Sequence, residues 1–400
     1  MISKKMQPLL NNNSAIRAMF EEGKRLAGIY GAENVYDFSL GNPNVPAPAA
    51  VNQAICRILE EEPSVFVHGY MSNAGYEDVR EAIAASLNRR FGTGFHVDNI
   101  LMTVGAASGL NVILKTLLDP GDEVLTFAPY FVEYGSYVRN YDGILKVVPP
   151  DTETFQPDLS GFRRMLTPLT RAVIINTPNN PTGVIYSAGT LKAMSDILRE
   201  KQEEYGTEIV LISDEPYREL AYDGAEVPYV TKFYDNTVIC YSYSKSLSLP
   251  GERIGYLVIP DALKDSREVF QAAVIANRVS GSVNAPSLMQ RVILRCVDEK
   301  VDLEAYDRNR SLLYNGLKAL GFSCIRPQGA FYLFVKSPEA DEKHFCEVCK
   351  KYNILVVPGT SFACPGFVRI SYCVSPEQIK RSLPAFQKVA EEYGLEGQSL

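Results

Sequence analysis

The chain has 400 residues, of which 46% are hydrophobic, 22% charged and 10% aromatic, a globular profile with room for one large and one smaller domain. Its net charge is −7 and its pI about 5.3, with no run of Lys or Arg, which argues against a general affinity for nucleic acid or anionic membranes. The N-terminal segment lacks an apolar stretch of signal length, and no window approaches the roughly 18 apolar residues of a membrane span, so we expect a cytosolic protein.

Short apolar runs alternate with helical patterns from residue 99 to residue 260. The first run, NILMTV (99–104), predicts a buried strand, and the helix after it ends at Pro120-Gly121. Further strands are predicted at EVLTFAP (123–129), ILKVVP (144–149), RAVIIN (171–176), EIVLIS (208–213), TVICYS (237–242) and RIGYLVIP (253–260). Because apolar strands joined by helical crossovers form sheets covered on both faces, the pattern predicts an α/β fold with a mainly parallel sheet.

The pattern changes after residue 286, which predicts a second domain. Long helices are followed by a hairpin-like GAFYLFVK (329–336), by ILVVPG (354–359) and by FVRISYCV (367–374). We therefore predict a large α/β domain over residues 48–286, and a smaller α+β domain that combines residues 1–47 with residues 287–400.

The cysteines do not predict a metal site. All 8 are scattered in a chain without a signal peptide, so we expect free thiols. The segment HFCEVCK brings His344, Cys346 and Cys349 together, but it lacks a fourth ligand and a second C-x-x-C. An amphipathic helix that turns Phe345, Val348 and Cys349 toward a core is favoured.

Parallel sheets bind ligands at the carboxyl ends of their strands, so the polar residues that follow each strand are candidates for a site. After NILMTV, the small residues Gly105, Ala106 and Ala107 open a helix, and a helix N-terminus suits a phosphate group. An ordinary strand-to-helix turn explains this fragment at least as well. It is not a G-x-G-x-x-G motif, so a dinucleotide-binding fingerprint is not supported.

Two later strand ends carry an amide and a carboxylate. Asn180 lies between rigid residues in TPNNPTG, where its amide suits a ligand oxygen or an ordinary Asx turn. Asp214 ends an apolar run, where an unpaired carboxylate is costly. It therefore either caps a helix or pairs with a cation such as a protonated ring nitrogen, and Tyr217 follows close enough to share that pocket.

The segment CYSYSKSLSLPGERIGY (240–256) offers two nucleophiles. Ser242 and Lys245 match the S-x-x-K pattern of serine acyl-enzymes, whereas Lys245 alone could form a Schiff base with a phosphorylated carbonyl cofactor. The hydroxyls of Ser242 and Ser244 and the guanidinium of Arg253 would then bind the phosphate. Acyl-enzymes of this type also carry S-D-N and K-T-G elements; SDE occurs at 213–215 but K-T-G does not occur, so we favour the lysine.

The ordered set of motifs resembles one enzyme family. GAA at 105–107, NPTG at 180–183, D-x-x-Y at 214–217, S-x-S-K at 242–245, Arg253 and Arg369 resemble the class I/II aminotransferases, the aspartate-aminotransferase-like group of fold-type I pyridoxal-phosphate enzymes. The resemblance spans nearly the whole chain, from SLGNP near the N-terminus to RISY. It implies a homodimer that uses pyridoxal 5′-phosphate to move an amino group from an L-amino acid to a 2-oxo acid.

The resemblance also implies roles around the cofactor ring. Lys245 would form the Schiff base and later move the proton, and Asp214 would pair with the pyridinium nitrogen. Asn180 and Tyr217 would hydrogen-bond the ring O3′. Phe131, or its neighbour Tyr130 if the alignment is shifted by one residue, would stack on the ring.

Other residues would hold the phosphate and the substrate. The resemblance assigns the phosphate to the amides at Gly105, Ala106 and Ala107, to Ser242, Ser244 and Arg253, and to the partner subunit's Tyr70. It assigns the substrate α-carboxylate to Arg369, with help from Gly41 and Asn180.

The substrate side chain is less constrained. In some close relatives a lysine at the position of Ala107 binds the distal carboxylate of a dicarboxylic substrate. Arg17 and Arg278 are candidates to replace it, although each is equally explained as a surface arginine. We predict an aspartate-type donor with 2-oxoglutarate as acceptor. Aromatic or neutral amino acids, or a β-lyase or decarboxylase reaction, are the alternatives.

Overall fold

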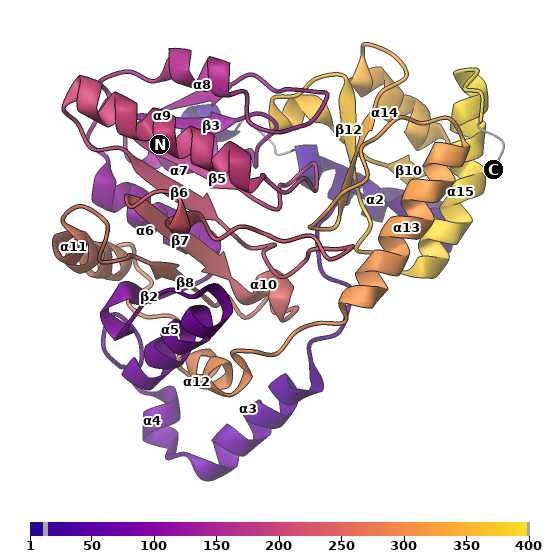
Figure 1. The fold of residues 1–400 in the computed structure, drawn as a ribbon. Helices are drawn as coiled ribbons and strands as arrows, with labels where there is room; N and C mark the ends of the chain where they lie inside the picture. The colour runs from indigo at the N-terminus through magenta and orange to yellow at the C-terminus, as the bar shows by residue number, and fades with distance from the viewer. Residues whose placement is uncertain (11–14, 398–400) are drawn as a thin grey trace.

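The larger part of the molecule is built on a seven-stranded sheet (Figure 1). The computed structural model describes residues 1–10 and 15–397. The strands lie in the order β2-β8-β7-β6-β5-β3-β4. Strands β7, β6, β5, β3 and β4 are parallel, and β8 runs antiparallel to both of its neighbours. Their bounds are β2 (Ile100–Thr103), β3 (Glu123–Phe127), β4 (Ile144–Val148), β5 (Thr170–Asn176), β6 (Val210–Asp214), β7 (Thr237–Ser242) and β8 (Gly255–Val258). The predicted mainly parallel sheet is confirmed.

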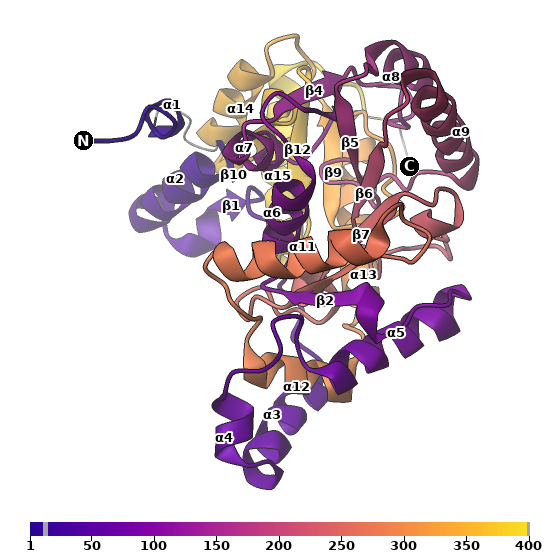
Figure 2. The ribbon, with the colours of Figure 1, turned by 90° about the vertical axis from the view of Figure 1, so that its left-hand side faces the viewer.

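Helices cover both faces of this sheet, as the continuously apolar strands predict. Neighbouring strand residues such as Leu211 and Ile212 belong to different buried clusters, because successive side chains of a strand point to opposite faces. One face packs against α6 (Ala106–Leu117), α7 (Glu133–Asn140) and α11 (Ser266–Val279), which lie in front of the sheet in Figure 2. The other packs against α5 (Glu77–Phe91), α8 (Leu159–Met165), α9 (Ala188–Tyr205) and α12 (Ser287–Cys296).

The C-terminal part forms a second layered unit, to the right in Figure 1. A three-stranded antiparallel sheet in the order β11-β12-β9 packs with helices α13 (Leu303–Ala319), α14 (Glu342–Lys351) and α15 (Pro376–Glu392). The N-terminal segment joins it, because β1 (Tyr36–Asp37) pairs in parallel with β10 (Ile354–Leu355). The exact domain boundaries at residues 47 and 286 remain a prediction.

Two predicted strands of this unit differ in detail. The hairpin-like GAFYLFVK forms one strand, β9 (Tyr332–Lys336), which pairs along its length with β12 (Phe367–Ser371). It does not fold back on itself, because Ala330 N donates to Leu220 O and so ties the start of the segment to another loop. ILVVPG divides into β10 and β11 (Val357–Pro358), which belong to different sheets.

The cysteine-containing helix is confirmed as an amphipathic core helix. In α14, Phe345, Val348 and Cys349 are buried, while His344 is exposed and contacts Glu339. All 8 cysteines of the chain are free thiols.

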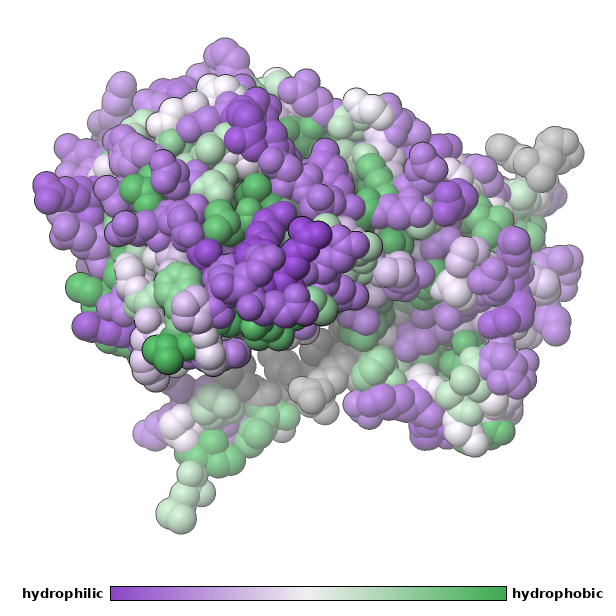
Figure 3. All heavy atoms as spheres, turned by 90° about the horizontal axis from the view of Figure 1, so that it is seen from below, coloured by the Kyte–Doolittle hydropathy of each residue, from purple (hydrophilic) through white to green (hydrophobic). Residues whose placement is uncertain are grey.

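The surface seen from below mixes hydrophilic side chains with hydrophobic patches (Figure 3). Helices α3 (Ala49–Glu61) and α4 (Ser64–His68) form the lowest part of the molecule in Figure 1, and Leu59, Val65 and Phe66 of these helices are exposed. Within the described residues, every helix is too short or too polar to cross a bilayer.

Candidate active site

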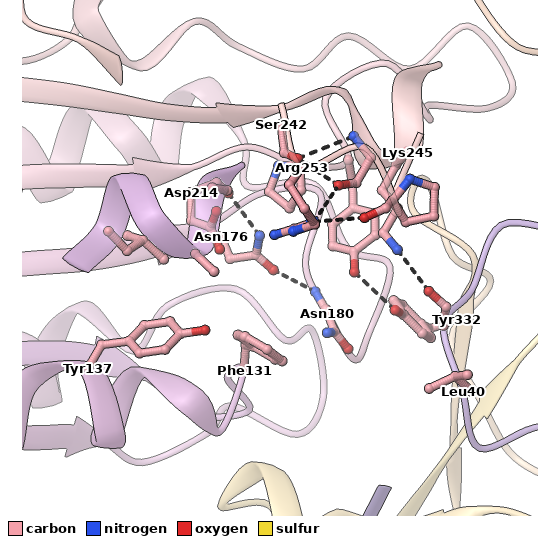
Figure 4. Close-up of a pocket in the computed structure, with 18 of the residues that line it drawn as sticks. Leu40, Phe131, Tyr137, Asn176, Asn180, Asp214, Ser242, Lys245, Arg253 and Tyr332 are labelled. Carbon is pink, nitrogen blue, oxygen red and sulfur yellow. Dashed lines mark hydrogen bonds between the residues drawn. The ribbon is translucent and has the colours of Figure 1, made fainter. Parts of the chain in front are cut away.

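A cavity of about 300 Å³ opens at the carboxyl ends of β5, β6 and β7, where the two units of the fold meet (Figure 4). It brings together residues that are distant in sequence. The predicted site residues that line it are Gly41, Ala106, Ala107, Phe131, Asn180, Asp214, Tyr217, Ser242, Ser244, Lys245, Arg253 and Arg369. Phe131 lines the cavity, whereas the alternative Tyr130 does not.

Two predicted residues lie outside the lining. Gly105 directly precedes α6 with a φ of 82°, and a Cβ at this position would lie 2.8 Å from Nη2 of Arg253. The positive φ favours glycine at this position, and the small residue leaves room for the Arg253 guanidinium. Tyr70 is 91% exposed and lies outside the cavity of its own chain.

One end of the cavity combines a helix N-terminus with hydroxyls and a cation. No side chain among the described residues caps the first turn of α6, which begins at Ala106. Ser242 caps the short helix α10 (Tyr243–Ser246) by accepting from the Ser244 N–H, and its Oγ lies 2.8 Å from Ser244 Oγ. Nη1 of Arg253 lies 3.4 Å from Ser244 Oγ. Free helix N–H groups, hydroxyls and a guanidinium form a suitable binding site for a phosphate dianion.

Lys245 is placed as an amine nucleophile. Its Nζ donates to Gly41 O at 2.8 Å and lies 5.3 Å from the centroid of the Phe331 ring. The pKa of Lys245 is lowered to about 8, chiefly by burial and also by the nearby Arg253 and Arg369, while Cys373 acts in the opposite direction. A sizeable fraction of the amine is therefore neutral near pH 8, as attack on a carbonyl requires. Ser242 bonds to Ser244 and not to Lys245, so the S-x-x-K arrangement lacks its central contact.

Asp214 offers a buried acceptor oxygen. Its Oδ2 accepts from the Tyr134 hydroxyl at 2.5 Å, while its Oδ1 is buried and has no hydrogen-bond partner within the described part of the chain. Burial raises the pKa of Asp214 to about 7, although the Tyr134 hydroxyl lowers it. An unpartnered carboxylate oxygen facing a cavity fits a cationic N–H, such as a protonated pyridine nitrogen.

This pKa predicts a pH-dependent stability for the cofactor-free protein. Between about pH 4 and pH 7 the unfolded chain releases the Asp214 proton while the folded protein retains it, so rising pH favours unfolding. Relative to an Asp214→Asn variant, the unfolding free energy of the wild type should fall across this window and then level off. Urea denaturation at several pH values measures the difference, and parallel curves for the two proteins would contradict the assignment.

Arg369 is a buried cation with no counter-charge among the described residues. It is 2% exposed; Nη1 donates to Asn180 Oδ1 at 3.1 Å, Nη2 donates to Ser39 O, and Nε has no partner in that part of the chain. By contrast, the buried Arg218 and Arg310 each pair with a carboxylate. A buried guanidinium that faces a cavity and lacks an acid of its own suits a carboxylate ligand.

Several residues of the site carry no distinctive signal in the sequence. Tyr332, Tyr137 and Leu40 line the cavity, and the Tyr134 hydroxyl donates to Asp214 Oδ2. Asn176 is different, because as a polar residue at the end of a predicted strand it is a candidate from the sequence. It ends β5, where its Nδ2 donates to Asp214 O and its Oδ1 accepts from Asn180 N.

The two arginines proposed for a distal carboxylate are not part of the described lining. Arg278 lies in the last turn of α11 with an exposed side chain. Arg17 belongs to α2 (Ala15–Tyr30), and its side chain lies outside the described part of the structure.

Comparison with known proteins identifies the family. The family model "Aminotransferase class I and II" matches residues 32–386. The chain belongs to the class I and II aminotransferases. Members of this family depend on pyridoxal phosphate, so the aminotransferase is a pyridoxal-phosphate-dependent transaminase, which moves an amino group from an amino acid to a 2-oxo acid.

Relatives and solved structures support both fold and family. The aminotransferase is 34% identical to the aspartate/prephenate aminotransferase of Thermus thermophilus, over 87% of this chain and 89% of that protein. It is 29% identical to aromatic-amino-acid aminotransferase 2 of Thermococcus litoralis, over 95% and 96%. An aminotransferase structure from Eubacterium rectale matches with a TM-score of 0.96 and 50% identity over 98% and 99% of the two chains. The T. thermophilus aspartate aminotransferase with maleate matches with a TM-score of 0.87 and 30% identity over 97% and 99%.

Proposed function

We propose that the cavity is the transamination site and that Lys245, Asp214 and Arg369 are its central residues. The observation that carries this proposal is that these groups share one cavity and that none of them forms a salt bridge among the described residues. Pyridoxal phosphate and an amino acid together supply an aldehyde, a protonated ring nitrogen and a carboxylate. Each otherwise costly buried group of the chain would then have a partner.

Each residue has a separate task in this proposal. Bound pyridoxal phosphate supplies the carbonyl that reacts with amines and the ring that withdraws electrons from the substrate Cα. The amine of Lys245 would remove the proton from that Cα and would deliver it to C4′, the carbon of the bound group that carries the aldehyde. Oδ1 of Asp214 accepts from the ring N–H and keeps that proton in place, and Tyr217 donates to an oxygen of the bound group.

The remaining residues bind and orient. Arg369 binds the substrate α-carboxylate, next to Asn180 and Gly41, and so fixes the Cα–H bond relative to the Lys245 amine. The N-terminus of α6, with Gly105, Ala106 and Ala107, holds the phosphate. Ser242, Ser244 and Arg253 support it from α10 and the loop that follows.

For the substrate, we propose an aspartate-type donor with 2-oxoglutarate as the acceptor. Support comes from the names of the relatives and from the binding of the dicarboxylate maleate by the T. thermophilus enzyme. Ala107 leaves the cavity without a lysine at that position, so the distal carboxylate needs another cation, for which Arg17 is the candidate. The aromatic lining from Phe131 and Tyr137 favours an aromatic donor as the second candidate.

Initial rates with different donors test this substrate assignment. With 2-oxoglutarate as acceptor, kcat/KM for aspartate should exceed that for phenylalanine by at least about 10-fold, because a charged group is recognised more selectively than an apolar surface. Arg17→Ala should remove most of this preference, while Arg278→Ala serves as the exposed control. Faster turnover of phenylalanine would support the aromatic candidate, and release of pyruvate and ammonia without amino transfer would indicate a β-lyase.

We further propose a cytoplasmic homodimer with shared active sites. Tyr70 is highly exposed and lies beside α4, whose Val65 and Phe66 are also exposed, as expected of a surface that a second subunit covers. In the dimer, the partner subunit's Tyr70 would reach the phosphate. Light scattering that finds a single chain in solution would contradict this proposal.

A further inference from the structure

Tyr332 lines the cavity, and the roles proposed so far do not include it. It begins β9, its side chain is 2% exposed, and it lies between two groups of the proposed site (Figure 4). Its hydroxyl oxygen is 3.0 Å from that of Tyr217. Its ring centroid is 4.6 Å from the guanidinium carbon of Arg369.

The ring of Tyr332 restricts the Arg369 guanidinium. The Phe362 ring lies 5.0 Å from the same guanidinium carbon, so two aromatic rings pack close to this group. Such contacts are attractive, and they become stronger where water is excluded. Because no carboxylate of the described chain holds Arg369, these rings and two hydrogen bonds determine its orientation.

The hydroxyl of Tyr332 lies close to the backbone of Gly41. A Cβ at position 41 would lie 2.1 Å from this hydroxyl oxygen, so Gly41 is required by its contact with Tyr332. The carbonyl of Gly41 in turn accepts from Lys245 Nζ. Tyr332 therefore contacts the backbone segment that positions the reactive amine, while its hydroxyl meets Tyr217.

The number of hydroxyl protons determines which tyrosine donates in the hydrogen bond between Tyr332 and Tyr217. Each hydroxyl has one proton, and Tyr217 is the hydrogen-bond partner of Tyr332 among the described residues. If the Tyr217 proton points toward an acceptor in the cavity, the hydrogen bond between the tyrosines requires that Tyr332 donate to Tyr217.

We propose that Tyr332 is a positioning residue, whose ring holds Arg369 and whose hydroxyl donates to Tyr217 so that the Tyr217 proton points to the bound cofactor. This inference rests on the proposed function, in which Tyr217 donates to the phenolic oxygen of pyridoxal phosphate. Burial raises the pKa of Tyr332 to about 12, so it keeps its proton over the working pH range. A hydroxyl that accepts a hydrogen bond becomes a better donor, by about 10–30% per bond.

The hydroxyl role is tested by a pH titration of the holoenzyme's visible absorption. A donor to the phenolic oxygen stabilises its deprotonated form, so weakening that donor should raise the apparent pKa of the cofactor band. We expect a rise of about 1–2 units for Tyr217→Phe and about 0.2–0.5 unit for Tyr332→Phe. Tyr372→Phe is the matched control, because the buried hydroxyl of Tyr372 donates to Ala330 O and lies outside the cavity lining; it should leave the titration unchanged.

The ring role is separated from the hydroxyl role by kinetics. Tyr332→Phe keeps the ring beside Arg369, so the KM for the amino donor should stay within about 2-fold of the wild type. Tyr332→Leu removes the ring as well, and its KM should rise by about 5-fold or more. A KM in Tyr332→Leu equal to that of Tyr332→Phe would overturn the ring role.

The outcomes distinguish this inference from the proposed function. A cofactor band that titrates in the wild type and shifts in Tyr217→Phe, but is unchanged in Tyr332→Phe, would overturn the hydroxyl role alone. A protein that binds no pyridoxal phosphate would overturn the proposed function together with this inference. A small rise in Tyr332→Phe and a larger one in Tyr217→Phe would support both.

Discussion

A Lys245→Ala variant is expected to lose at least about 10⁴-fold in kcat for amino transfer, because it lacks both the amine that attacks the cofactor and the base that moves the substrate proton. The structure gives this residue no substitute: Lys245 is the only lysine that lines the cavity in the described part of the chain. Single-turnover absorption measurements with an excess of amino donor would measure the loss.

A serine variant provides the matched control. Ser242→Ala removes a hydroxyl three residues away, but it leaves Lys245 and its contact with Gly41 intact. It should keep the visible cofactor band and bind pyridoxal phosphate more weakly. If Lys245→Ala kept full activity while Ser242→Ala lost it, the result would contradict the role of Lys245 and would favour Ser242 as the nucleophile of an acyl-enzyme.

Replacing Arg369 with methionine should lower kcat/KM for every amino donor by about 10²–10³-fold, because a carboxylate loses its buried cationic partner. The same change should not destabilise the cofactor-free protein, and we expect its unfolding midpoint to stay equal or rise. The physical reason is that Arg369 is buried and pairs with no carboxylate of the described residues, so its charge costs free energy until a ligand binds.

Arg310→Met is the control for this prediction. Arg310 is also fully buried, but it pairs with Asp223 and Asp307 and lies outside the cavity lining. Its replacement removes hydrogen bonds to both aspartates, which are partly exposed to solvent, and should destabilise the fold by about 1–3 kcal/mol. Comparable loss of stability in both variants, or a change of less than about 10-fold in kcat/KM for Arg369→Met, would contradict the role of Arg369.

The sheet and most of the site could be predicted because their signals are local. Each strand is a short apolar run, and Asn180, Asp214 and Lys245 follow such runs directly. Parallel strands bring these residues to one edge, so a linear order of motifs becomes a cavity. Arg369 was predicted only from the resemblance to a family. It lies in the second unit of the fold, and the local sequence does not show that this strand comes close to the ends of the large sheet.

The tyrosines of the site could not be predicted from the local sequence. The chain has 23 of them, and buried tyrosines are common in cores, so neither Tyr134 nor Tyr332 stands out from its segment. Tyr332 reaches the site because β9 pairs with β12, which places it opposite Ser371 and within reach of Arg369. That register is a long-range property of the fold. The proposed role of Tyr70 depends on a second subunit. A local sequence pattern does not show where that subunit lies.

The lysine that carries the covalently bound cofactor shows directly whether this cavity is the transamination site. Purified holoenzyme is reduced with borohydride, digested, and analysed by mass spectrometry for the peptide that carries the pyridoxyl group. The structure predicts a single labelled position, Lys245. A label on a different lysine, or a protein that cannot be labelled after reconstitution with pyridoxal phosphate, would contradict the assignment of this cavity as the transamination site.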